Sequence, residues 1–258
     1  MNDTTKLLDK LIEILCAERE ESVPCVPENQ KFTLFRALVN IRMPKEVSEE
    51  FLQIQNQYLQ AILKQKEITN IADLSPIMSD IYLWQGDITT FKCDGIVNAA
   101  NAQMLGCFCP NHGCIDNAIH TFAGVQLRLE CANIMIAQGK EESVGQAKIT
   151  SAYNLPCRYI LHTVGPMVVG ELTKWHEQQL ASCYRACLKL ADENNLKSLA
   201  FCCISTGEFH FPNKRAAEIA IQAVSEYKQQ TQSKIKVVFN VFKGGDYDIY
   251  TKLLRTNK

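Results

Sequence analysis

Leu199-Ala-Phe-Cys-Cys-Ile204 is the stretch of sequence that decides the fold class, because its apolar residues follow one another without a break. Such a run suits a strand in a sheet that is covered on both faces, as parallel sheets are. A loop that begins with Ser205-Thr-Gly207 follows, and a helical pattern starts after Pro212. A buried strand, a loop and a helix in this order predict the α/β class.

The same alternation of strands and helices runs through residues 76–258. The predicted strands are Ile81–Trp84, Gly95–Asn98, Tyr159–Val164, Ser198–Ile204 and Ile235–Phe242. The predicted helices are Ile115–Gln138, Trp175–Asn194, Asn213–Gln230 and Asp246–Leu254. We therefore expect a three-layer α/β/α domain with a mostly parallel mixed sheet, in which ligands bind at the carboxyl ends of the strands.

Residues 1–75 form a different region, which contains no glycine and places apolar residues at helical spacing. The spacing predicts one helix around Leu7–Leu15, a short one around Phe32–Leu38 and a third from about Pro44 to Gln65. We find no chemical motif in these helices. We predict an N-terminal helical extension at residues 1–75, with a docking or capping role, and one α/β domain at residues 76–258.

Composition and charge exclude several classes of protein. The 258 residues are 47% hydrophobic, and 27 Lys and Arg against 28 Asp and Glu give a net charge of −1. A balance this close to zero argues against a strong electrostatic grip on nucleic acid or an anionic membrane. Eight charged residues are spread over the first twenty positions, so we expect no secretion signal and a cytoplasmic protein.

The 12 cysteines are unexpected in such a protein, because disulfides are rare without secretion. Most are scattered and suit small buried apolar positions. Cys107, His112 and Cys114 are different, because their spacing of C-x₄-H-x-C on a Gly- and Pro-containing loop matches a set of zinc ligands. Three ligands would leave one zinc position open, whereas Cys109 as a fourth would close it. A metal-free, redox-active loop is the other interpretation.

Two short polar clusters follow the first two predicted strands. Gln85-Gly-Asp-Ile-Thr89 contains an aspartate that can accept hydrogen bonds from a base amino group, or can cap the next turn. Val97-Asn-Ala-Ala-Asn101 places two carboxamides beside small residues. The pair suits ribose hydroxyls, and two turn-forming asparagines are the structural alternative.

Two further clusters follow the last two predicted strands. The loop Ser205-Thr-Gly-Glu-Phe-His-Phe-Pro212 leads into a helix and offers backbone N–H groups to phosphates. Phe242 begins the segment Phe242-Lys-Gly-Gly-Asp246, where an aromatic ring can stack on a base or belong to the rim of the core.

Together and in this order, the clusters resemble the macrodomain family, in particular its MacroD-like branch. The resemblance covers about residues 77–258 and rests on four motifs. These are Gly86-Asp-Ile-Thr89, Val97-Asn-Ala-Ala-Asn101, Ile115-Asp-Asn-Ala-Ile-His120 with Ala123-Gly124, and Ile204-Ser-Thr-Gly207. Macrodomains bind ADP-ribose, and many of this branch remove it from proteins.

The resemblance implies a role for each matching residue. Asp87 corresponds to the residue that reads the adenine amino group, Phe242 to the ring that stacks on adenine, and Asp116 to the aspartate beside the distal ribose. Asn98 and Asn101 correspond to the distal-ribose asparagines, and residues 205–209 to the diphosphate loop. The implied ligand-binding set is Asp87, Ile88, Asn98, Asn101, Ser205, Thr206, Gly207, Glu208, Phe209, Phe211 and Phe242, with Asp116, Asn101 and Asn98 as the catalytic set.

One loop departs from the usual MacroD-like pattern, because Gly106–Cys114 stands where most relatives have a run of glycines. It resembles the zinc-containing macrodomain subgroup, whose N-terminal extension is also similar. That likeness implies one Zn²⁺ per chain on Cys107, His112 and Cys114. It also implies, as a family association, a lipoyl-carrier protein that a sirtuin-type ADP-ribosyltransferase has modified. His210 stands where many relatives have glycine.

The leading hypothesis is a zinc-dependent hydrolase that removes mono-ADP-ribose from modified protein side chains. A reader that binds ADP-ribose without turnover and an O-acetyl-ADP-ribose deacetylase are the alternatives. His120 lies on the helical face of Asp116 and either pairs with it or packs, and His162 has a structural role as part of a strand. We expect a monomer.

Overall fold

The computed structural model describes residues 3–256, and a six-stranded sheet is its centre. The strands of this sheet are β2 (Ile81–Gln85), β4 (Gly95–Ala100), β5 (Ala147–Ser151), β6 (Tyr159–Val164), β7 (Ser198–Phe201) and β8 (Lys236–Val241). Their order is β2-β8-β7-β4-β6-β5, and only the pair β5–β6 is antiparallel. The predicted mostly parallel mixed sheet is therefore confirmed.

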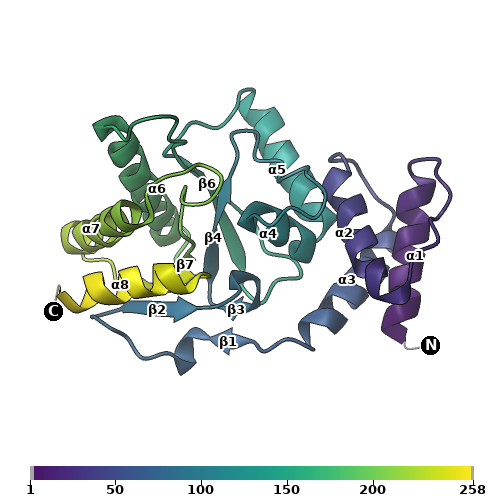
Figure 1. The fold of residues 1–258 in the computed structure, drawn as a ribbon, viewed down its shortest axis with the longest axis horizontal. Helices are drawn as coiled ribbons and strands as arrows, with labels where there is room; N and C mark the ends of the chain where they lie inside the picture. The colour runs from purple at the N-terminus through teal and green to yellow at the C-terminus, as the bar shows by residue number, and fades with distance from the viewer. Residues whose placement is uncertain (1–2, 257–258) are drawn as a thin grey trace.

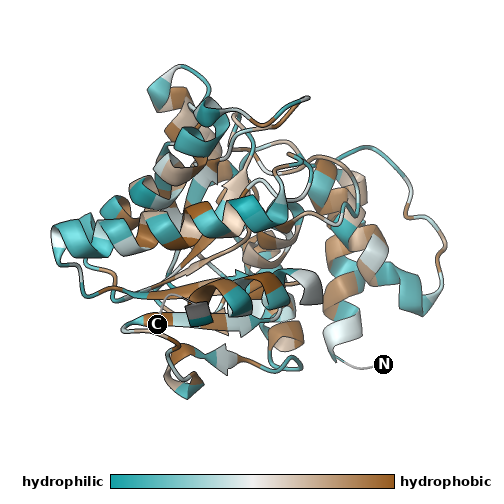
Figure 2. Ribbon diagram, turned by 60° about the vertical axis from the view of Figure 1, so that its left-hand side comes forward, coloured by the Kyte–Doolittle hydropathy of each residue, from teal (hydrophilic) through white to brown (hydrophobic). Residues whose placement is uncertain are grey.

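Helices cover both faces of the sheet and complete the three layers (Figure 1). One face carries α4 (Ile115–Ala123) and α5 (Val125–Gln138), and the other carries α6 (Lys174–Glu193), α7 (Asn213–Thr231) and α8 (Gly244–Thr256). Hydrophobic residues dominate the strands between them (Figure 2). Ile96 and Val97 on β4 point to opposite faces and are both fully buried. These strands are covered on both faces, as their uninterrupted apolar sequences predict.

The structure corrects two of the predicted elements and adds a strand. The predicted strand Ser198–Ile204 ends at Phe201, because the chain turns at residues 204–205. The predicted helix Ile115–Gln138 is two helices, because Gly124 has φ +106° and ends α4 before α5 begins. That backbone conformation is one that only glycine adopts easily. Edge strand β5 was not predicted, since its sequence Ala-Lys-Ile-Thr-Ser is half polar and only partly buried. It carries no continuous apolar run to reveal it.

The N-terminal extension builds a hydrophobic core of its own at the right of Figure 1. Its helices are α1 (Asp3–Ala17), α2 (Lys31–Ile41) and α3 (Glu49–Leu63), with a short 3₁₀ turn at Glu28–Gln30. Leu11, Leu15, Phe35 and Phe51 are almost completely buried between these helices. The proposed division of the chain at residue 75 stays a prediction.

Several contacts join the extension to the rest of the chain. Val125 of α5 belongs to the core of the extension, and Phe32 of α2 stacks on Phe122 of α4 with 6.1 Å between ring centroids. At the end of the extension, β1 (Thr69–Asn70) pairs in parallel with β3 (Phe91–Lys92). The 3₁₀ turn Ile71–Asp73 follows β1, and the 3₁₀ turn Ile88–Thr90 precedes β3. The connecting chain is thus tied to the segment that follows β2.

Arg128 of α5 is a buried charged link between the two parts. Its side chain is 4% exposed, and its Nη1 donates to the carbonyl oxygens of Val39, Asn40 and Arg42 at the end of α2. These carbonyls have no partner inside the helix. A cation at a helix C-terminus also interacts favourably with the helix dipole.

We expect Arg128→Met to lower the free energy of unfolding by about 2–4 kcal/mol, because it leaves buried carbonyl oxygens without a donor. Urea unfolding followed by circular dichroism measures the change. The matched control is Arg185→Met, since Arg185 is exposed and pairs with Glu226 at 3.8 Å on the surface. We expect the control to cost less than about 0.5 kcal/mol. Equal stabilities for the two variants would contradict the role given to Arg128.

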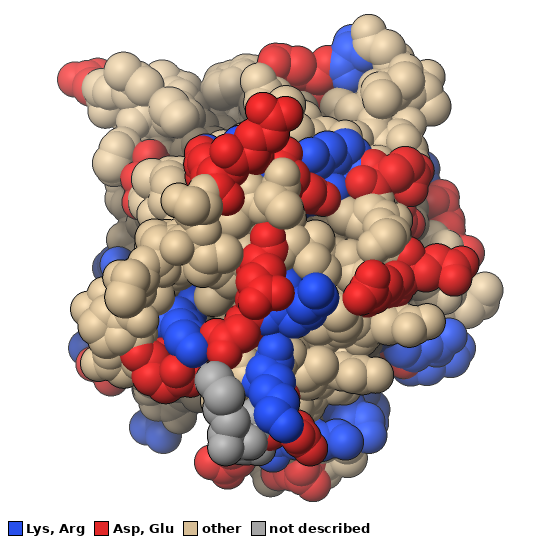
Figure 3. Space-filling view, turned by 90° about the vertical axis from the view of Figure 1, so that its right-hand side faces the viewer, with Lys and Arg blue, Asp and Glu red and all other residues tan. Residues whose placement is uncertain are grey.

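Basic and acidic side chains are intermixed over the face that the N-terminal helices form (Figure 3). This mixture agrees with the net charge of −1 for the whole chain. In residues 3–256, no helix has the length and apolar character needed to cross a membrane.

Candidate active site

A cavity of about 620 Å³ opens at the carboxyl ends of β2, β4, β6, β7 and β8. The residues that follow each of these strands line the cavity, among them Asp87, Asn101, Gly165, Ser205 and Phe242. The volume lies in the range of sites for nucleotide-sized ligands. Its position is the one that parallel α/β sheets favour for binding.

One end of the cavity carries Asp87, Ile88 and Phe242. Asp87 begins the 3₁₀ turn Ile88–Thr90, and its Oδ1 accepts from the backbone N and the hydroxyl of Thr89 at 3.0 and 2.7 Å. Its other oxygen lies 3.5 Å from Nζ of Lys66. Phe242 is 74% exposed, so its ring is a free apolar surface at the rim. Asp87 thus already caps a turn while facing the cavity.

The loop at residues 205–209 forms another wall of the cavity. Ser205 has φ +65°, and its carbonyl oxygen accepts from the Phe211 N–H at 3.0 Å, which closes the loop. Within residues 3–256, the backbone N–H groups of Gly207, Glu208 and Phe209 find no hydrogen-bond acceptor. Helix α7 begins directly after this loop. Free N–H groups before a helix N-terminus are suited to bind an anion.

Asn101 and Asp116 both line the cavity. In the sequence, Asn101 precedes the Gly106–Cys114 loop and Asp116 follows it. Asn101 donates from Nδ2 to the carbonyl of Gly106 at 3.1 Å, while its buried Oδ1 has no partner among the described residues. Asp116 accepts at Oδ1 from Nδ2 of Asn98 at 2.8 Å. Burial raises the pKa of Asp116 to about 6, and the hydrogen bond from Asn98 and the charge of Arg128 oppose that shift.

Two buried histidines lie behind Asp116. Nδ1 of His162 lies 3.1 Å from Nδ2 of Asn98, and its Nε2 lies 2.9 Å from the hydroxyl of Thr150. Burial lowers the pKa of His162 to about 3, so the ring is neutral, accepts at Nδ1 and donates at Nε2. His162 thus orients Asn98 from inside the sheet.

His120 packs against Asp116 without a hydrogen bond. Its Nε2 lies 3.5 Å from Oδ1 of Asp116, but neither ring nitrogen has a hydrogen-bond partner among the described residues. Desolvation, followed by the charges of His162 and Arg128, lowers the pKa of His120 well below its usual value. The His120 ring is therefore neutral, and its contact with the Asp116 carboxylate at 3.5 Å is not an ion pair. His120 and His162 also approach Cys131, at a position that the cavity does not reach.

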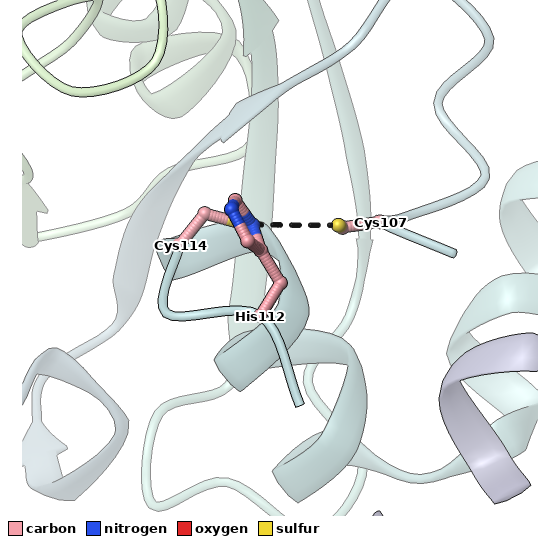
Figure 4. Close-up of side chains that lie close together, drawn as sticks. All are labelled: Cys107, His112 and Cys114. Atoms are coloured by element: carbon pink, nitrogen blue, oxygen red, sulfur yellow. Dashed lines mark hydrogen bonds between the residues drawn. The ribbon is translucent and has the colours of Figure 1, made fainter. Parts of the chain in front are cut away.

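Cys107, His112 and Cys114 come together at the cavity, as Figure 4 shows. The ligand atoms of the three side chains lie within 4.8 Å of one another, and Sγ of Cys107 is 3.6 Å from Nδ1 of His112. Tetrahedral zinc, with bonds of about 2.3 Å to sulfur and about 2.0 Å to nitrogen, separates such atoms by about 3.5 Å. The donor set and its spacing therefore fit a zinc ion.

The surroundings of these three side chains favour an open site. Cys109 is exposed and lies outside the group. Cys114 caps the N-terminus of α4 and accepts from the Asn117 N–H at 3.4 Å. Burial raises the pKa of the Cys114 thiol to about 12, and this hydrogen bond opposes the shift. Nε2 of His112 faces Oε1 of Glu208 across the cavity at 3.6 Å.

Two residues of the expected ligand-binding set do not line the cavity. Asn98 is fully buried behind Asp116 and lines no part of the cavity, because the pleat of β4 turns its side chain toward His162. Phe211 is 1% exposed and belongs to the core, because the turn at His210, with φ +55°, directs the chain back into the domain. The other residues of the expected binding and metal sets line the cavity.

The cavity also contains residues that the sequence did not single out. One of them is Gly165, where a Cβ atom would lie 2.1 Å from Oγ of Ser205 and would displace that side chain. Its place after a predicted strand, in Val164-Gly-Pro166, was an available signal. Arg36 reaches the cavity from α2, and no local pattern on that helix reveals it. Other unassigned lining residues are Phe122, Asn213, Asn240, Lys243 and Asp246.

Comparisons with known proteins agree with this geometry. The family model "Macro domain" matches residues 97–220. The chain is 53% identical to a protein-ADP-ribose hydrolase of Treponema medium, over 95% of this chain and 96% of that protein. It is 50% identical to a protein-ADP-ribose hydrolase of Staphylococcus aureus, over 94% of this chain and 93% of that protein.

A solved structure adds the fold. The crystal structure of a Trypanosoma brucei macrodomain in complex with ADP-ribose aligns with a TM-score of 0.67 at 30% sequence identity. The alignment covers 85% of this chain and 94% of that one. Fold, cavity and relatives agree, and the chain therefore belongs to the macrodomain family.

Proposed function

We propose that the chain is a zinc-dependent hydrolase that removes mono-ADP-ribose from modified protein side chains, and that it belongs to the zinc-containing group of the MacroD-like branch. One observation carries the proposal. A single cavity of about 620 Å³ contains both the groups that suit ADP-ribose and the side chains of Cys107, His112 and Cys114. The names of the relatives from Treponema medium and Staphylococcus aureus support the same reaction.

The cavity offers complementary groups for the adenine, the diphosphate and the distal ribose of ADP-ribose. Asp87 would accept from the adenine amino group, and the exposed ring of Phe242 would stack on the base. The free N–H groups of residues 207–209 would donate to the diphosphate. The partnerless Oδ1 of Asn101 would accept from a hydroxyl of the distal ribose.

Cys107, His112 and Cys114 would hold one zinc ion per chain, since their donor atoms and spacing fit it. When bound, zinc supplies a Lewis acid that polarises an oxygen of the ribose or of the ester. Three protein ligands leave a position for such an oxygen, and the exposed Cys109 leaves that position free. Glu208 would fix the orientation of the His112 ring through Nε2.

Asp116 would orient the attacking water and take up its proton. Its Oδ1 is held by Asn98, so the carboxylate cannot rotate freely. Asn98 is held in turn by His162. These hydrogen bonds fix the direction of the remaining carboxylate oxygen at the edge of the cavity. Positioned proton acceptors of this kind accelerate such reactions by about 10²–10⁴-fold.

The biological setting is part of the proposal. We propose a cytoplasmic monomer that acts on a carboxylate ester of ADP-ribose. The acceptor we propose is a lipoyl-carrier protein that a sirtuin-type ADP-ribosyltransferase has modified. The intermixed charges of the N-terminal face would permit a protein substrate of either sign to approach.

The test is hydrolysis of an auto-ADP-ribosylated protein, with zinc quantified in the same sample before and after treatment with a strong chelator. We expect release of ADP-ribose, one zinc per chain, and loss of release after chelation without loss of the fold. Binding of ADP-ribose without release from a panel of ester-linked substrates would identify a reader instead. Release from O-acetyl-ADP-ribose alone would identify a deacetylase.

Phe242→Ala tests the proposed position of adenine. We expect the dissociation constant of ADP-ribose to rise by about 5–10-fold, because stacking on an aromatic ring contributes about 1 kcal/mol or more. Titration calorimetry measures the change. The matched control is Tyr247→Ala, an exposed aromatic on α8 that does not line the cavity. Equal affinities of Phe242→Ala and the unmodified chain would show that adenine lies elsewhere.

A further inference from the structure

The metal loop, which we define as residues 106–114, is held from outside by the N-terminal extension. Arg36 of α2 donates from Nη2 to the carbonyl oxygen of His112 at 2.9 Å. The same guanidinium donates from Nε and Nη2 to Oδ1 of Asn117 at 3.0 and 2.7 Å. A residue from the first part of the chain therefore contacts the backbone of one of the proposed ligands directly.

The Asn117 side chain extends this contact to a second point of the metal loop. Its Nδ2 donates to the carbonyl oxygen of Cys109 at 2.9 Å, and the residue is fully buried. Because Arg36 occupies Oδ1 of Asn117, the guanidinium also fixes the direction of this amide. Arg36 thus determines the positions of the Cys109 and His112 carbonyls together.

Asn40, one turn further along α2, holds the loop at a third point. Its Oδ1 accepts from the Asn111 N–H at 3.0 Å, where Asn111 has φ +56°. Its Nδ2 donates to the hydroxyl of Thr121 at 3.0 Å, and the side chain is 1% exposed. The backbone between Cys109 and His112 therefore depends on α2 for its conformation.

This dependence has a reason in the sequence of the loop. In the structure, residues 106–114 form turns and bends without a helix or a strand, so no ladder of hydrogen bonds orders them. Ordering each such residue costs about 1–2 kcal/mol of conformational entropy. Zinc needs its ligands in place to within a few tenths of an ångström. Bonds that order the loop beforehand therefore raise the affinity for the ion.

We propose that Arg36 is a positioning residue of the metal loop, so that the N-terminal extension is a working part of the metal centre and not only a docking or capping unit. The inference rests on the proposed function for its zinc ion. An arginine is suited to this role, because its planar fork reaches two acceptors at once and a lysine cannot reproduce that geometry.

The experiment measures zinc affinity of the full chain by competition with a chromogenic chelator. We expect Arg36→Met to lower zinc affinity by about 10–100-fold, as loss of groups that orient metal ligands does. The matched control is Lys31→Met, a basic residue of the same helix that pairs with Asp9 and Glu28 inside the extension. We expect the control to change zinc affinity by less than about twofold.

Further readouts distinguish a positioning role from a general loss of structure. We expect Arg36→Met to retain cooperative urea unfolding, because Arg36 belongs to neither of the two large hydrophobic cores. With cobalt(II) in place of zinc, we expect its visible absorption, which reports tetrahedral ligation, to weaken and shift. Arg36→Lys keeps the charge and serves if Arg36→Met does not fold, and we expect it to lose zinc affinity as well.

Two results would overturn the inference, and each shows whether the positioning role or the zinc proposal has failed. If the unmodified chain and both Arg36 variants hold zinc equally, the zinc proposal stands and the positioning role fails. If the unmodified chain itself binds no zinc, the metal in the proposed function fails and the inference fails with it.

Discussion

His112→Ala is expected to lose the zinc ion and to lower hydrolysis of ADP-ribosylated protein by at least about 100-fold. The substitution removes one of the three proposed ligands, and two thiols alone would not hold the ion against a chelator. His112 is also the ligand whose backbone Arg36 holds and whose Nε2 faces Glu208. Metal analysis by mass spectrometry and a hydrolysis assay on the same preparation measure both losses.

Cys109→Ala is the matched control for this variant. Cys109 lies in the same loop, but its side chain is exposed and outside the cluster of ligand atoms. We expect full zinc occupancy and an unchanged rate, because only its backbone carbonyl takes part in the loop. Full occupancy in His112→Ala as well would refute the ligand assignment. Zinc loss in Cys109→Ala would instead favour a closed site with four protein ligands.

Asp116→Asn is expected to lower the rate of hydrolysis by about 10²–10⁴-fold while zinc content stays at one per chain. The amide has the shape of the carboxylate but cannot take up a proton from the attacking water. Asn98 can still donate to the remaining oxygen, so the local structure survives. Steady-state kinetics with ADP-ribosylated protein and metal analysis of the same sample measure the two quantities.

The same substitution at Asp87 separates catalysis from binding. Asp87 lies at another end of the cavity and caps the turn at Thr89. We expect Asp87→Asn to raise KM and to leave kcat nearly unchanged, because the residue would contact the adenine and not the reacting bond. Asp116→Asn should do the reverse. An unchanged kcat in Asp116→Asn would remove Asp116 from the reaction.

The sheet was predictable because its strands are buried on both faces. Short, uninterrupted apolar runs such as Leu199–Ile204 indicate buried strands when much longer helical patterns lie on either side of them in the sequence. The edge strand Ala147–Ser151 escaped, because a partly exposed strand of mixed polarity resembles a loop. The break between α4 and α5 at Gly124 was not predicted, because the apolar pattern continues across it. The pattern of residues does not show that the backbone of Gly124 has a positive φ.

The site was predictable to the extent that it is local in sequence. Cys107, His112 and Cys114 lie within one loop, so their spacing alone indicates that they converge. Asn98 and Asn101 are also local, but the pattern does not show that the pleat of β4 turns Asn98 toward His162 and leaves only Asn101 at the cavity. Arg36 is far from the cavity in sequence, and its role depends on how two separate cores pack together.

The hydrogen bonds that hold residues 109–112 to α2, directly or through Asn117, limit how this loop can be moved into another protein. Inserting the Gly106–Cys114 sequence into a macrodomain that lacks these helices would copy the proposed ligands. It would not copy the carboxamides and the guanidinium that hold the backbone between them. Removing residues 1–75 from this chain would do the converse, and would also strip Arg128 of its acceptors. The metal loop and the N-terminal helices would therefore have to be transferred together from one protein to another, because neither would keep its structure without the other.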